Sequence, residues 1–344
     1  MKKIAICLLL SVCLCACSAG SGSYVKQDQI ELNYNNISAH NDFWLTNESI
    51  CYLEDNLVQN YYMATENGRS RLCSNGGYGF GIIQQYGNRI YMLDESDYID
   101  EANEDYLLKY YDLDTKKTKE ITSIRNCDNY LVLDEIVYYL KYNWTDDARI
   151  LSLHSYSMDS QAHAEIHASV LSFGVIENSL VYLTEQDGTV SVYRYDQSEG
   201  RSDQCGQFSL EIADTVKFRE DVIASYTPDY LLLAFVNDAD ESAIIWKYTF
   251  ETGTVDEIKL GGFLWDFIAY EEYSYLALQE KEISTIFQME NATGDTTKIG
   301  EMEGGCSLFV GSDAGVYVLS HNTGKLFYYS KQSEPTLVYP VSAQ

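Results

Sequence analysis

Three stretches of eleven residues decide the fold of this chain: YDLDTKKTKEI from Tyr111 to Ile121, YSMDSQAHAEI from Tyr156 to Ile166 and YTFETGTVDEI from Tyr248 to Ile258. Each begins with tyrosine, carries an acidic residue three positions later and ends with isoleucine. The polarity alternates at first, and a polar run rich in Asp, Thr and Gly follows. Such a pattern predicts two β-strands joined by a tight turn, which is a hairpin, at each of the three places.

Four further segments follow the same pattern. They begin at Tyr62, Tyr193, Phe287 and Phe327, with the sequences YMATENGRSRL, YRYDQSEGRSD, FQMENATGDTTKI and FYYSKQSEPTL. The copy at Phe287 has two extra residues, and the copy at Tyr193 lacks the closing aliphatic residue. The seven aromatic anchors are spaced by 49, 45, 37, 55, 39 and 40 residues. Recurrence at this period is typical of repeat architectures.

An apolar strand is expected before each hairpin, and another short strand before that one. The second strands are ICYL at Ile50, IYML at Ile90, IVYYL at Ile136, LVYL at Leu180, LLLAF at Leu231, YSYLAL at Tyr273 and VYVL at Val316. The first strands are visible as DFWL from Asp42, FGII from Phe80, NYLVL from Asn129 and LSFGVI from Leu171. Each unit therefore has four strands and needs no helix.

Seven such units predict an all-β fold: a single β-propeller over residues 37–344, with seven blades of four antiparallel strands. A small sheet can bury its faces only against its neighbours, and closing the circle removes the exposed ends of the array. The 30 tyrosines suit this packing, since the ring is apolar while the hydroxyl can stay wet. Six or eight blades are alternatives, because residues 36–75 and 192–227 match the repeat least well, and a pair of β-sandwiches is the other compatible architecture.

The repeat resembles the tyrosine-rich propeller repeats of bacterial lipoproteins, and more loosely those of the TolB, quinoprotein and kelch types. The resemblance covers residues 40–340. The Trp-Asp signature of WD40 repeats and the paired glycines of kelch repeats are missing. The resemblance therefore implies a fold and no particular activity.

The N-terminus has the features of a signal peptide. Residues 1–16 join a basic start, MKK, to an apolar stretch of about 11 residues, which is too short for a bilayer core that needs roughly 20. The sequence LCAC ending at Cys17 resembles the lipobox of bacterial lipoproteins, although Cys15 stands where Ala, Ser or Val is usual. The resemblance implies cleavage before Cys17, lipidation of that cysteine and a tether over residues 17–36. We expect an exported protein whose lipid holds it on the outer face of the cell membrane, or on the outer membrane of a cell with two.

The chain is strongly acidic. Its formal net charge of −29 becomes −31 once residues 1–16, with two lysines and no acidic residue, are removed. Such a surface repels phosphate, so nucleic acid is not expected as a partner. A basic protein, a cation or a glycan fits better, and the simpler interpretation is that the charge keeps an exported monomer soluble.

Five cysteines are left after cleavage and lipidation, an odd number without CxxC spacing. They are Cys51, Cys73, Cys127, Cys205 and Cys306. Their scatter favours buried free thiols over zinc ligands or a disulfide framework, and leaves their redox state open. We expect no cofactor, with a divalent cation such as calcium as the open alternative.

Catalytic motifs are scarce. HAEIH places His163 and His167 four residues apart as in a zinc protease, but its glutamate is displaced and the segment is a predicted strand, which favours a structural role. The glycines of residues 76–81, GGYGFG, lack the spacing and the following helix of a dinucleotide loop. Residues 94–105, DESDYIDEANED, are acidic but lack EF-hand spacing.

The clearest functional signal is where the repeat is interrupted. From the second-strand tyrosine to the hairpin aromatic the chain takes 10 residues in the first unit, but 20 in the second and 18 in the third. We expect long loops there, on one rim with the matching loop of the fifth unit, because insertions in repeat folds map to one face. The candidate binding residues are Asp94, Glu95, Asp97, Asp100, Glu101, Glu104, Asp105, Tyr142, Trp144, Asp146, Asp147, Asp238, Asp240 and Glu241. Alternatively, these loops are solvated and bind nothing.

Three functions are compatible with these features. We favour a non-enzymatic, surface-anchored binding module that acts through the acidic rim. The second is a propeller enzyme acting on envelope or dietary glycans, which predicts two channel carboxyls within about 10 Å of each other, one with a raised pKa. The third is a structural or sensor subunit of an envelope complex. A propeller fold alone does not decide between them.

Overall fold

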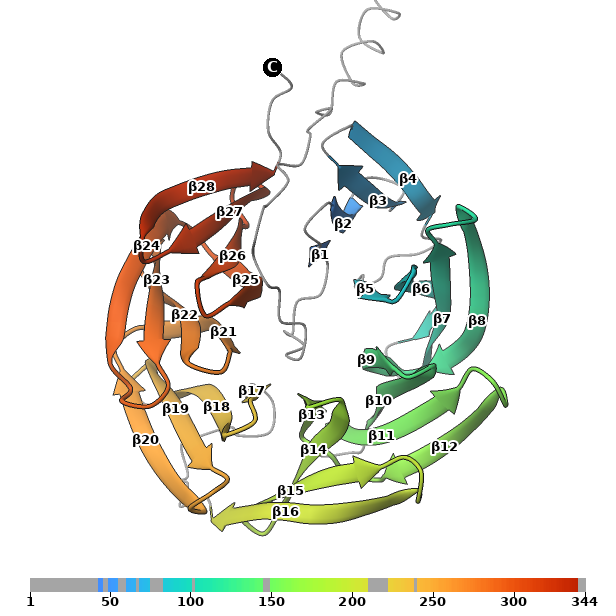
Figure 1. The fold of residues 1–344 in the computed structure, drawn as a ribbon, viewed down its shortest axis with the longest axis horizontal. Coiled ribbons are helices and arrows are strands. Elements are labelled where there is room, and N and C mark those ends of the chain that lie inside the picture. The colour runs from blue at the N-terminus through green and yellow to red at the C-terminus, as the bar shows by residue number, and fades with distance from the viewer. Residues whose placement is uncertain are drawn as a thin grey trace, which may run out of the picture.

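The described chain is a ring of β-sheets. The structure is a computed structural model that describes residues 43–45, 49–54, 60–65, 68–74, 83–100, 103–144, 149–209, 222–237 and 240–339. These ranges contain 28 strands and no helix, and the strands form seven sheets of four antiparallel strands. Figure 1 shows the sheets arranged radially, with the first strand of each near the axis and the fourth at the outside.

Each blade consists of four consecutive strands. Blade 1 holds β1 (Phe43–Leu45), β2 (Ser49–Glu54), β3 (Asn60–Thr65) and β4 (Gly68–Ser74). Blade 2 holds β5 (Ile83–Tyr86), β6 (Arg89–Asp100), β7 (Asn103–Asp112) and β8 (Lys117–Arg125). Blade 3 holds β9 (Cys127–Leu133), β10 (Ile136–Trp144), β11 (Arg149–Ser157) and β12 (Ala162–His167). Blade 4 holds β13 (Ser172–Ile176), β14 (Ser179–Gln186), β15 (Thr189–Asp196) and β16 (Arg201–Ser209).

The remaining three blades continue the same order. Blade 5 holds β17 (Ile223–Tyr226), β18 (Tyr230–Asn237), β19 (Ser242–Thr249) and β20 (Thr254–Leu260). Blade 6 holds β21 (Phe263–Ala269), β22 (Tyr273–Glu280), β23 (Ile283–Glu290) and β24 (Thr296–Glu303). Blade 7 holds β25 (Cys306–Ser312), β26 (Gly315–Ser320), β27 (Lys325–Ser330) and β28 (Ser333–Tyr339). The predicted seven-bladed propeller with four antiparallel strands per blade is confirmed, against the six-blade, eight-blade and sandwich alternatives.

The aromatic anchors of the repeat lie at two different distances from the end of the third strand. Three anchors stand one residue before the end of a third strand, and four stand three residues before it. The first group is Tyr111, Tyr156 and Tyr248, and the second is Tyr62, Tyr193, Phe287 and Phe327. A shift of two residues keeps a side chain on the same face of a strand, so the apolar pattern is retained although the turns begin at different distances from the anchor.

The core lies between adjacent blades, and tyrosines are its largest side chains. Tyr91 of blade 2 and Tyr130 of blade 3 are fully buried in one shared apolar cluster, and Tyr275 and Tyr317 are fully buried in blades 6 and 7. A tyrosine ring contributes a wide apolar surface, and its hydroxyl needs a hydrogen-bond partner when buried. The tyrosine-rich composition therefore serves packing between sheets.

In the described residues, the ring closes without exchange of strands between its first and last blades. The sheets β1–β4 and β25–β28 are each built from one end of the described chain. They meet through an apolar cluster in which Ile50 and Ala64 pack with Phe309, Tyr317 and Val338. Hydrophobic burial, rather than a shared hydrogen-bonded sheet, therefore joins the last blade to the first.

The expected signal peptide (1–16), the cysteine expected to carry lipid, Cys17, and the expected tether (17–36) lie outside the described residues. In the described part, no helix has the length and apolar character needed to span a membrane.

Candidate functional site

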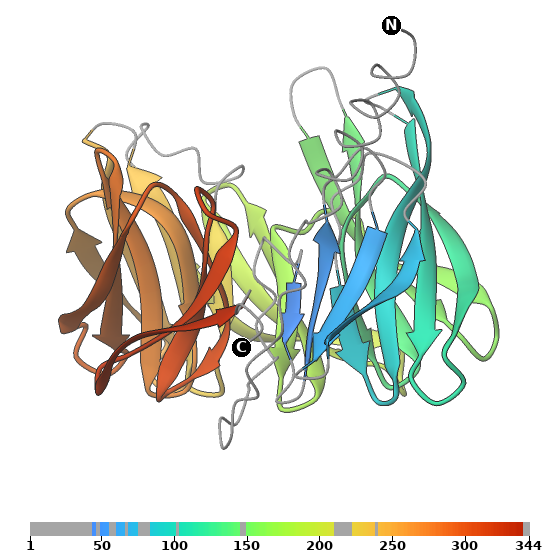
Figure 2. The same ribbon diagram turned by 90° about the horizontal axis from the view of Figure 1, so that it is seen from above.

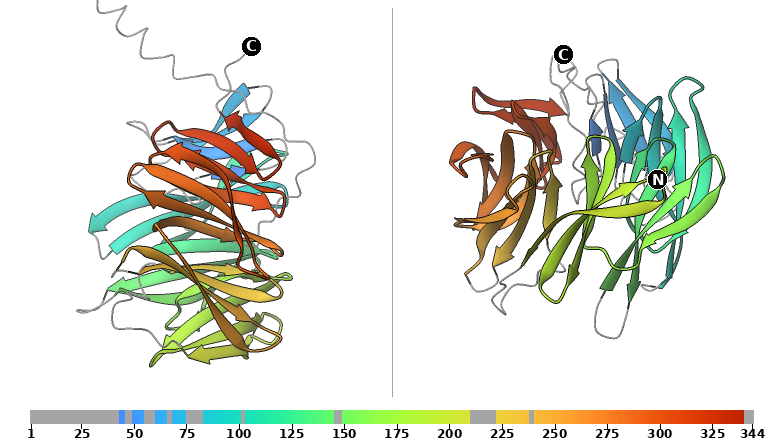
Figure 3. Two further views of the ribbon diagram at one scale, coloured as in Figure 1. Left: turned by 90° about the vertical axis from the view of Figure 1, so that its left-hand side faces the viewer. Right: turned by 60° about the horizontal axis from the view of Figure 1, so that its bottom comes forward.

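The propeller has two faces that carry different chain connections. Strands alternate in direction within a blade, so first-to-second and third-to-fourth connections lie at one face, the turn face, and second-to-third connections lie at the other, the hairpin face. Figures 2 and 3 show the strands running between the two faces. In Figure 2 the β6–β7 and β10–β11 hairpins of the neighbouring blades 2 and 3 reach beyond the body of the ring.

The predicted acidic loop of blade 2 is a strand pair, and the expectation of an unpaired loop is wrong. Asp94, Glu95, Asp97 and Asp100 lie on β6, Glu104 and Asp105 lie on β7, and Glu101 lies outside the described residues. The pairing continues to Asp100 opposite Asn103, with two register shifts on the way. It forms because the backbone N–H and C=O groups of a segment that leaves the ring still need partners.

The blade 3 hairpin exposes one of its two candidate aromatic residues. Tyr142 and Trp144 lie at the end of β10, with ring centroids 6.5 Å apart at 71°. Tyr142 is 5% exposed and contacts the indole edge-on, so it is not itself a contact surface, whereas Trp144 is 57% exposed. Asp146 and Asp147 lie outside the described residues.

The candidate residues of the fifth unit do not join this group. Asp238 lies outside the described residues, while Asp240 and the exposed Glu241 follow β18 of blade 5, across the ring from blades 2 and 3 in Figure 1. The Asp240 carboxylate accepts a hydrogen bond from Lys259 at 2.7 Å and one from the Ser242 hydroxyl. These contacts lower the pKa of Asp240 to about 2. The structure therefore brings together the hairpins of blades 2 and 3 and leaves that of blade 5 apart.

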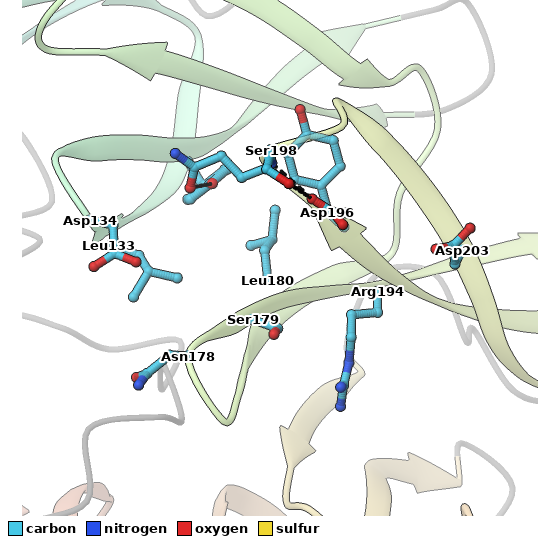
Figure 4. Close-up of a pocket in the computed structure, with 12 residues that line it drawn as sticks. Leu133, Asp134, Asn178, Ser179, Leu180, Arg194, Asp196, Ser198 and Asp203 are labelled. Atoms are coloured by element: carbon cyan, nitrogen blue, oxygen red, sulfur yellow. Dashed lines mark hydrogen bonds between the residues drawn. The ribbon is translucent and has the colours of Figure 1, made fainter.

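A cavity of about 380 Å³ on the turn face, between blades 3 and 4, is a second candidate site that sequence reasoning missed. Its polar lining includes Asp134, Asn178, Arg194, Asp196 and Asp203. Figure 4 shows Asp134 and Asn178 on one side, Arg194 and Asp203 on the other, and Leu180 between them. The two-residue turns that border it are recognisable in the sequence, but the space between them depends on how adjacent blades meet.

The HAEIH segment does not form a metal site. A register shift between Leu153 and His154 places His163 and His167 on opposite faces of β12. His163 bonds to the Tyr139 hydroxyl at 2.9 Å, while His167 packs against Tyr182 of blade 4. Throughout the described ranges, no group of three or more His, Cys, Asp or Glu side chains is placed to hold a metal ion.

The described cysteines with placed side chains are free thiols, and three of four are buried. Cys51, Cys127 and Cys306 are buried, whereas Cys205 is exposed, contrary to the expectation for it. Burial raises the pKa of Cys51 and of Cys306 to about 12. Since the thiolate is the reactive form, these two thiols are structural rather than chemical groups.

Comparison with known proteins defines the class through the fold alone. No protein-family model matches the sequence, and no curated protein matches it significantly. The β-propeller domain of the Trilobed protease from Pyrococcus furiosus, which has an open velcro topology, is similar with a TM-score of 0.59 at 13% identity, over 91% of this chain and 100% of that one. The likeness shows that the chain has a β-propeller fold.

Two other solved structures extend the comparison. The acylaminoacyl peptidase of Pyrococcus horikoshii is similar with a TM-score of 0.55 at 12% identity over 84% of this chain, which spans half the length of that protein. TolB from Acinetobacter baumannii is matched at a TM-score of 0.42 and 14% identity, over 86% of this chain and 81% of that one. At such identities the likeness concerns the fold and carries no activity to this chain.

Proposed function

We propose that this protein is a non-enzymatic binding module, held on the outer face of a membrane by lipid on Cys17, which binds a basic protein segment at the hairpin face of blades 2 and 3. One observation carries the binding proposal. Trp144 is 57% exposed at the end of β10, on the blade next to residues 94–105, which hold seven acidic residues and no Lys or Arg.

A basic segment would gain from both features. Acidic side chains gathered on one surface steer a cationic partner towards it and raise its local concentration. An exposed indole attracts a lysine or arginine side chain over its face, a contact worth about 0.5–1 kcal/mol at exposed sites. Because paired strands already order both hairpins, binding costs less conformational entropy than on unpaired loops.

The described inner strands give the glycan-enzyme alternative no support. The carboxyls on these strands are Asp128 of blade 3 and Asp266 of blade 6, which are not neighbouring blades. The oxygens of the buried Asp266 carboxyl accept the backbone N–H groups of Phe267 and Leu308. Asp266, one of these two carboxyls, is therefore engaged in backbone hydrogen bonds within the core.

The test measures binding of a fluorescent Lys/Arg-rich peptide to the full-length protein by anisotropy. We expect the affinity to fall as salt rises, because exposed charges are screened. Changing Asp94, Asp97 and Asp100 to Asn should weaken binding about tenfold, since three ion pairs of about 0.5 kcal/mol each sum to about the 1.4 kcal/mol of a tenfold change. Trp144→Ala should weaken it by a smaller factor.

A matched control makes the same change of charge on the turn face. Asp159→Asn, Glu251→Gln and Glu334→Gln alter three exposed carboxyls near third-to-fourth connections. Binding should be retained in this variant. Equal loss in both triple variants would show that net charge, rather than the hairpins of blades 2 and 3, attracts the peptide, and would refute the proposed site.

A further inference from the structure

The cavity between blades 3 and 4 lies where two other blade junctions have a direct contact between their turns. Between blades 2 and 3, the Tyr86 hydroxyl donates to Asp134 at 2.9 Å, which joins the two first-to-second turns. Between blades 6 and 7, Asp313 accepts the backbone N–H groups of Glu272 and Tyr273 at 2.9 and 3.0 Å. Adjacent turns are thus bonded directly at these two junctions.

The corresponding turns of blades 3 and 4 stand apart. They are centred on Asp134 with Glu135 and on Glu177 with Asn178, and all four residues have positive φ, as two-residue hairpin turns require. Both turns are fully described, and no hydrogen bond joins them. The cavity of about 380 Å³ fills the space between them.

Apart from the turns, blades 3 and 4 are joined in the same way as blades 2 and 3 and as blades 6 and 7. Tyr91, Tyr138 and Tyr275 are each the third residue of a second strand, in blades 2, 3 and 6. Each hydroxyl donates a hydrogen bond to the next blade. The acceptors are the Met158 sulfur for Tyr91 (3.9 Å), the Gln197 side chain for Tyr138 (3.0 Å) and the Ser312 carbonyl for Tyr275 (3.0 Å). The cavity is therefore a bounded space at a joined junction, not the result of two blades that fail to pack.

The charges of the lining define what could fill it. The lining holds the carboxylates of Asp134, Asp196 and Asp203 and one guanidinium, that of Arg194. Asp203 is already paired with Arg201, at 3.5 Å, which leaves Asp134 and Asp196 in excess over Arg194. Hydrogen bonds from Ser198 and from the Glu199 backbone lower the pKa of Asp196, so that it is a carboxylate at neutral pH. Arg194 has a long ion pair of 3.9 Å with Glu177. The lining thus favours a ligand with more cationic than anionic groups, but with a carboxylate for Arg194.

We propose that this cavity binds a small basic zwitterion of the size of one amino acid. Its carboxylate lies against Arg194, and its cationic end lies towards Asp134 on the opposite side of the cavity (Figure 4). The volume is at the lower end of the roughly 300–1,000 Å³ of small-molecule pockets, and the half-buried Leu133 and Tyr195 provide apolar surface for the aliphatic part of the ligand. The site is on the face opposite the proposed peptide surface and is independent of it.

The test is isothermal titration calorimetry of the full-length protein with L-lysine as the probe and L-norleucine as its match, which has the same carbon chain without the terminal amine. We expect L-lysine to bind at least about tenfold more tightly, because a hydrogen bond between charged groups is worth about that factor or more. Arg194→Gln should weaken L-lysine binding by a similar factor. Arg125→Gln, which alters an exposed, ion-paired arginine of blade 2, should leave it unchanged.

A cavity-filling variant keeps the proposal open to refutation. Ser179→Tyr places a ring in the cavity and should abolish L-lysine binding, while thermal unfolding checks that the propeller is intact. Unchanged L-lysine binding in a folded Ser179→Tyr protein would overturn the proposal. Equal affinity for L-norleucine or glucose, or no heat with millimolar L-lysine, would also overturn it.

Discussion

The junction of blades 6 and 7 and the junction of blades 3 and 4 share a hydrogen bond from a second-strand tyrosine, Tyr275 or Tyr138, but differ in the contacts around it. Between blades 6 and 7, the fully buried Asp266 carboxylate accepts the Leu308 N–H at 2.7 Å, and Gly300 lets the Tyr329 ring pack directly on the backbone. Between blades 3 and 4, the Tyr138 hydroxyl bonds to the exposed Gln197, and a cavity separates the adjacent turns.

The difference separates a junction whose contacts are needed for stability from a junction whose cavity is available to a ligand. A buried carboxylate is retained only if its hydrogen bonds are made, so a change at the first junction leaves amides unpaired in the core. An exposed hydrogen bond, such as that between Tyr138 and Gln197, can be replaced by hydrogen bonds to water with little loss of free energy. The open junction can therefore hold a ligand without weakening the ring.

The largest expected effect comes from removing the buried Asp266 carboxylate, which bonds to blade 7. Asp266→Ala leaves the N–H groups of Phe267 and Leu308 without their acceptor, and should lower the free energy of unfolding by about 3–5 kcal/mol. Gln197→Ala, the matched change at the open junction, should cost about 1 kcal/mol or less. Urea denaturation followed by circular dichroism measures both. Equal shifts of the midpoint would remove the distinction between the two junctions.

A smaller effect is expected where a ring packs on glycine. A Cβ added at Gly300 would lie 2.2 Å from the Tyr329 ring, which is a clash, so Gly300→Ala should cost about 1–3 kcal/mol in thermal unfolding. Gly261 has no neighbour within 4 Å of such a Cβ and an ordinary backbone conformation. Gly261→Ala should change stability by less than about 0.5 kcal/mol, and a comparable loss there would show that backbone freedom, not the Tyr329 contact, explains the Gly300 result.

The smallest effect is a pH dependence at a third kind of junction, between blades 2 and 3. His163 bonds to Tyr139 and, at 3.2 Å, to Thr122 of blade 2, and burial lowers the pKa of His163 and of His154. Below an ordinary histidine pKa of about 6.5 the unfolded chain binds more protons than the folded one. The free energy of unfolding therefore keeps its full value above about pH 6.5, and it decreases as the pH falls from there through the lowered histidine pKa values.

This dependence is read from melting temperatures between pH 5.5 and pH 7.5. The variant with His154→Gln and His163→Gln should show a flatter curve over that range, because neither side chain can then take up a proton. A curve as steep as that of the unchanged protein would assign the dependence to other groups.

Sequence reasoning predicted the blades well because their signal is local. A strand that packs between two sheets must present apolar residues at the spacing of the pleat, so the units around Ile90, Ile136 and Leu180 were recognisable from composition and period. The same reasoning was wrong for residues 94–100 and 103–105, where acidic residues that resemble a loop are paired strands. Pairing depends on a partner strand, and polar composition does not reveal it.

The two candidate sites differ in the same way, since sequence patterns indicate one of them and not the other. The segments of blades 2 and 3 were found because insertions change the spacing of the repeat, although the structure buries Tyr142 and separates Asp240 from the rest. The cavity at Asp134 and Arg194 has no such signal. These residues are 60 positions apart in the chain, and whether their turns touch is decided by the packing of two whole sheets.

By itself, then, the sequence determined the four-stranded unit and the strongly acidic character of residues 94–105 and favoured seven blades, because the pattern of each unit is set by its own backbone and by the need to bury one stripe of side chains. The tertiary structure decided how the units meet: which junction buries a carboxylate, which leaves a cavity, and which aromatic side chain is exposed. Those properties depend on the shapes of two neighbouring sheets at once, and no single segment of the chain encodes them.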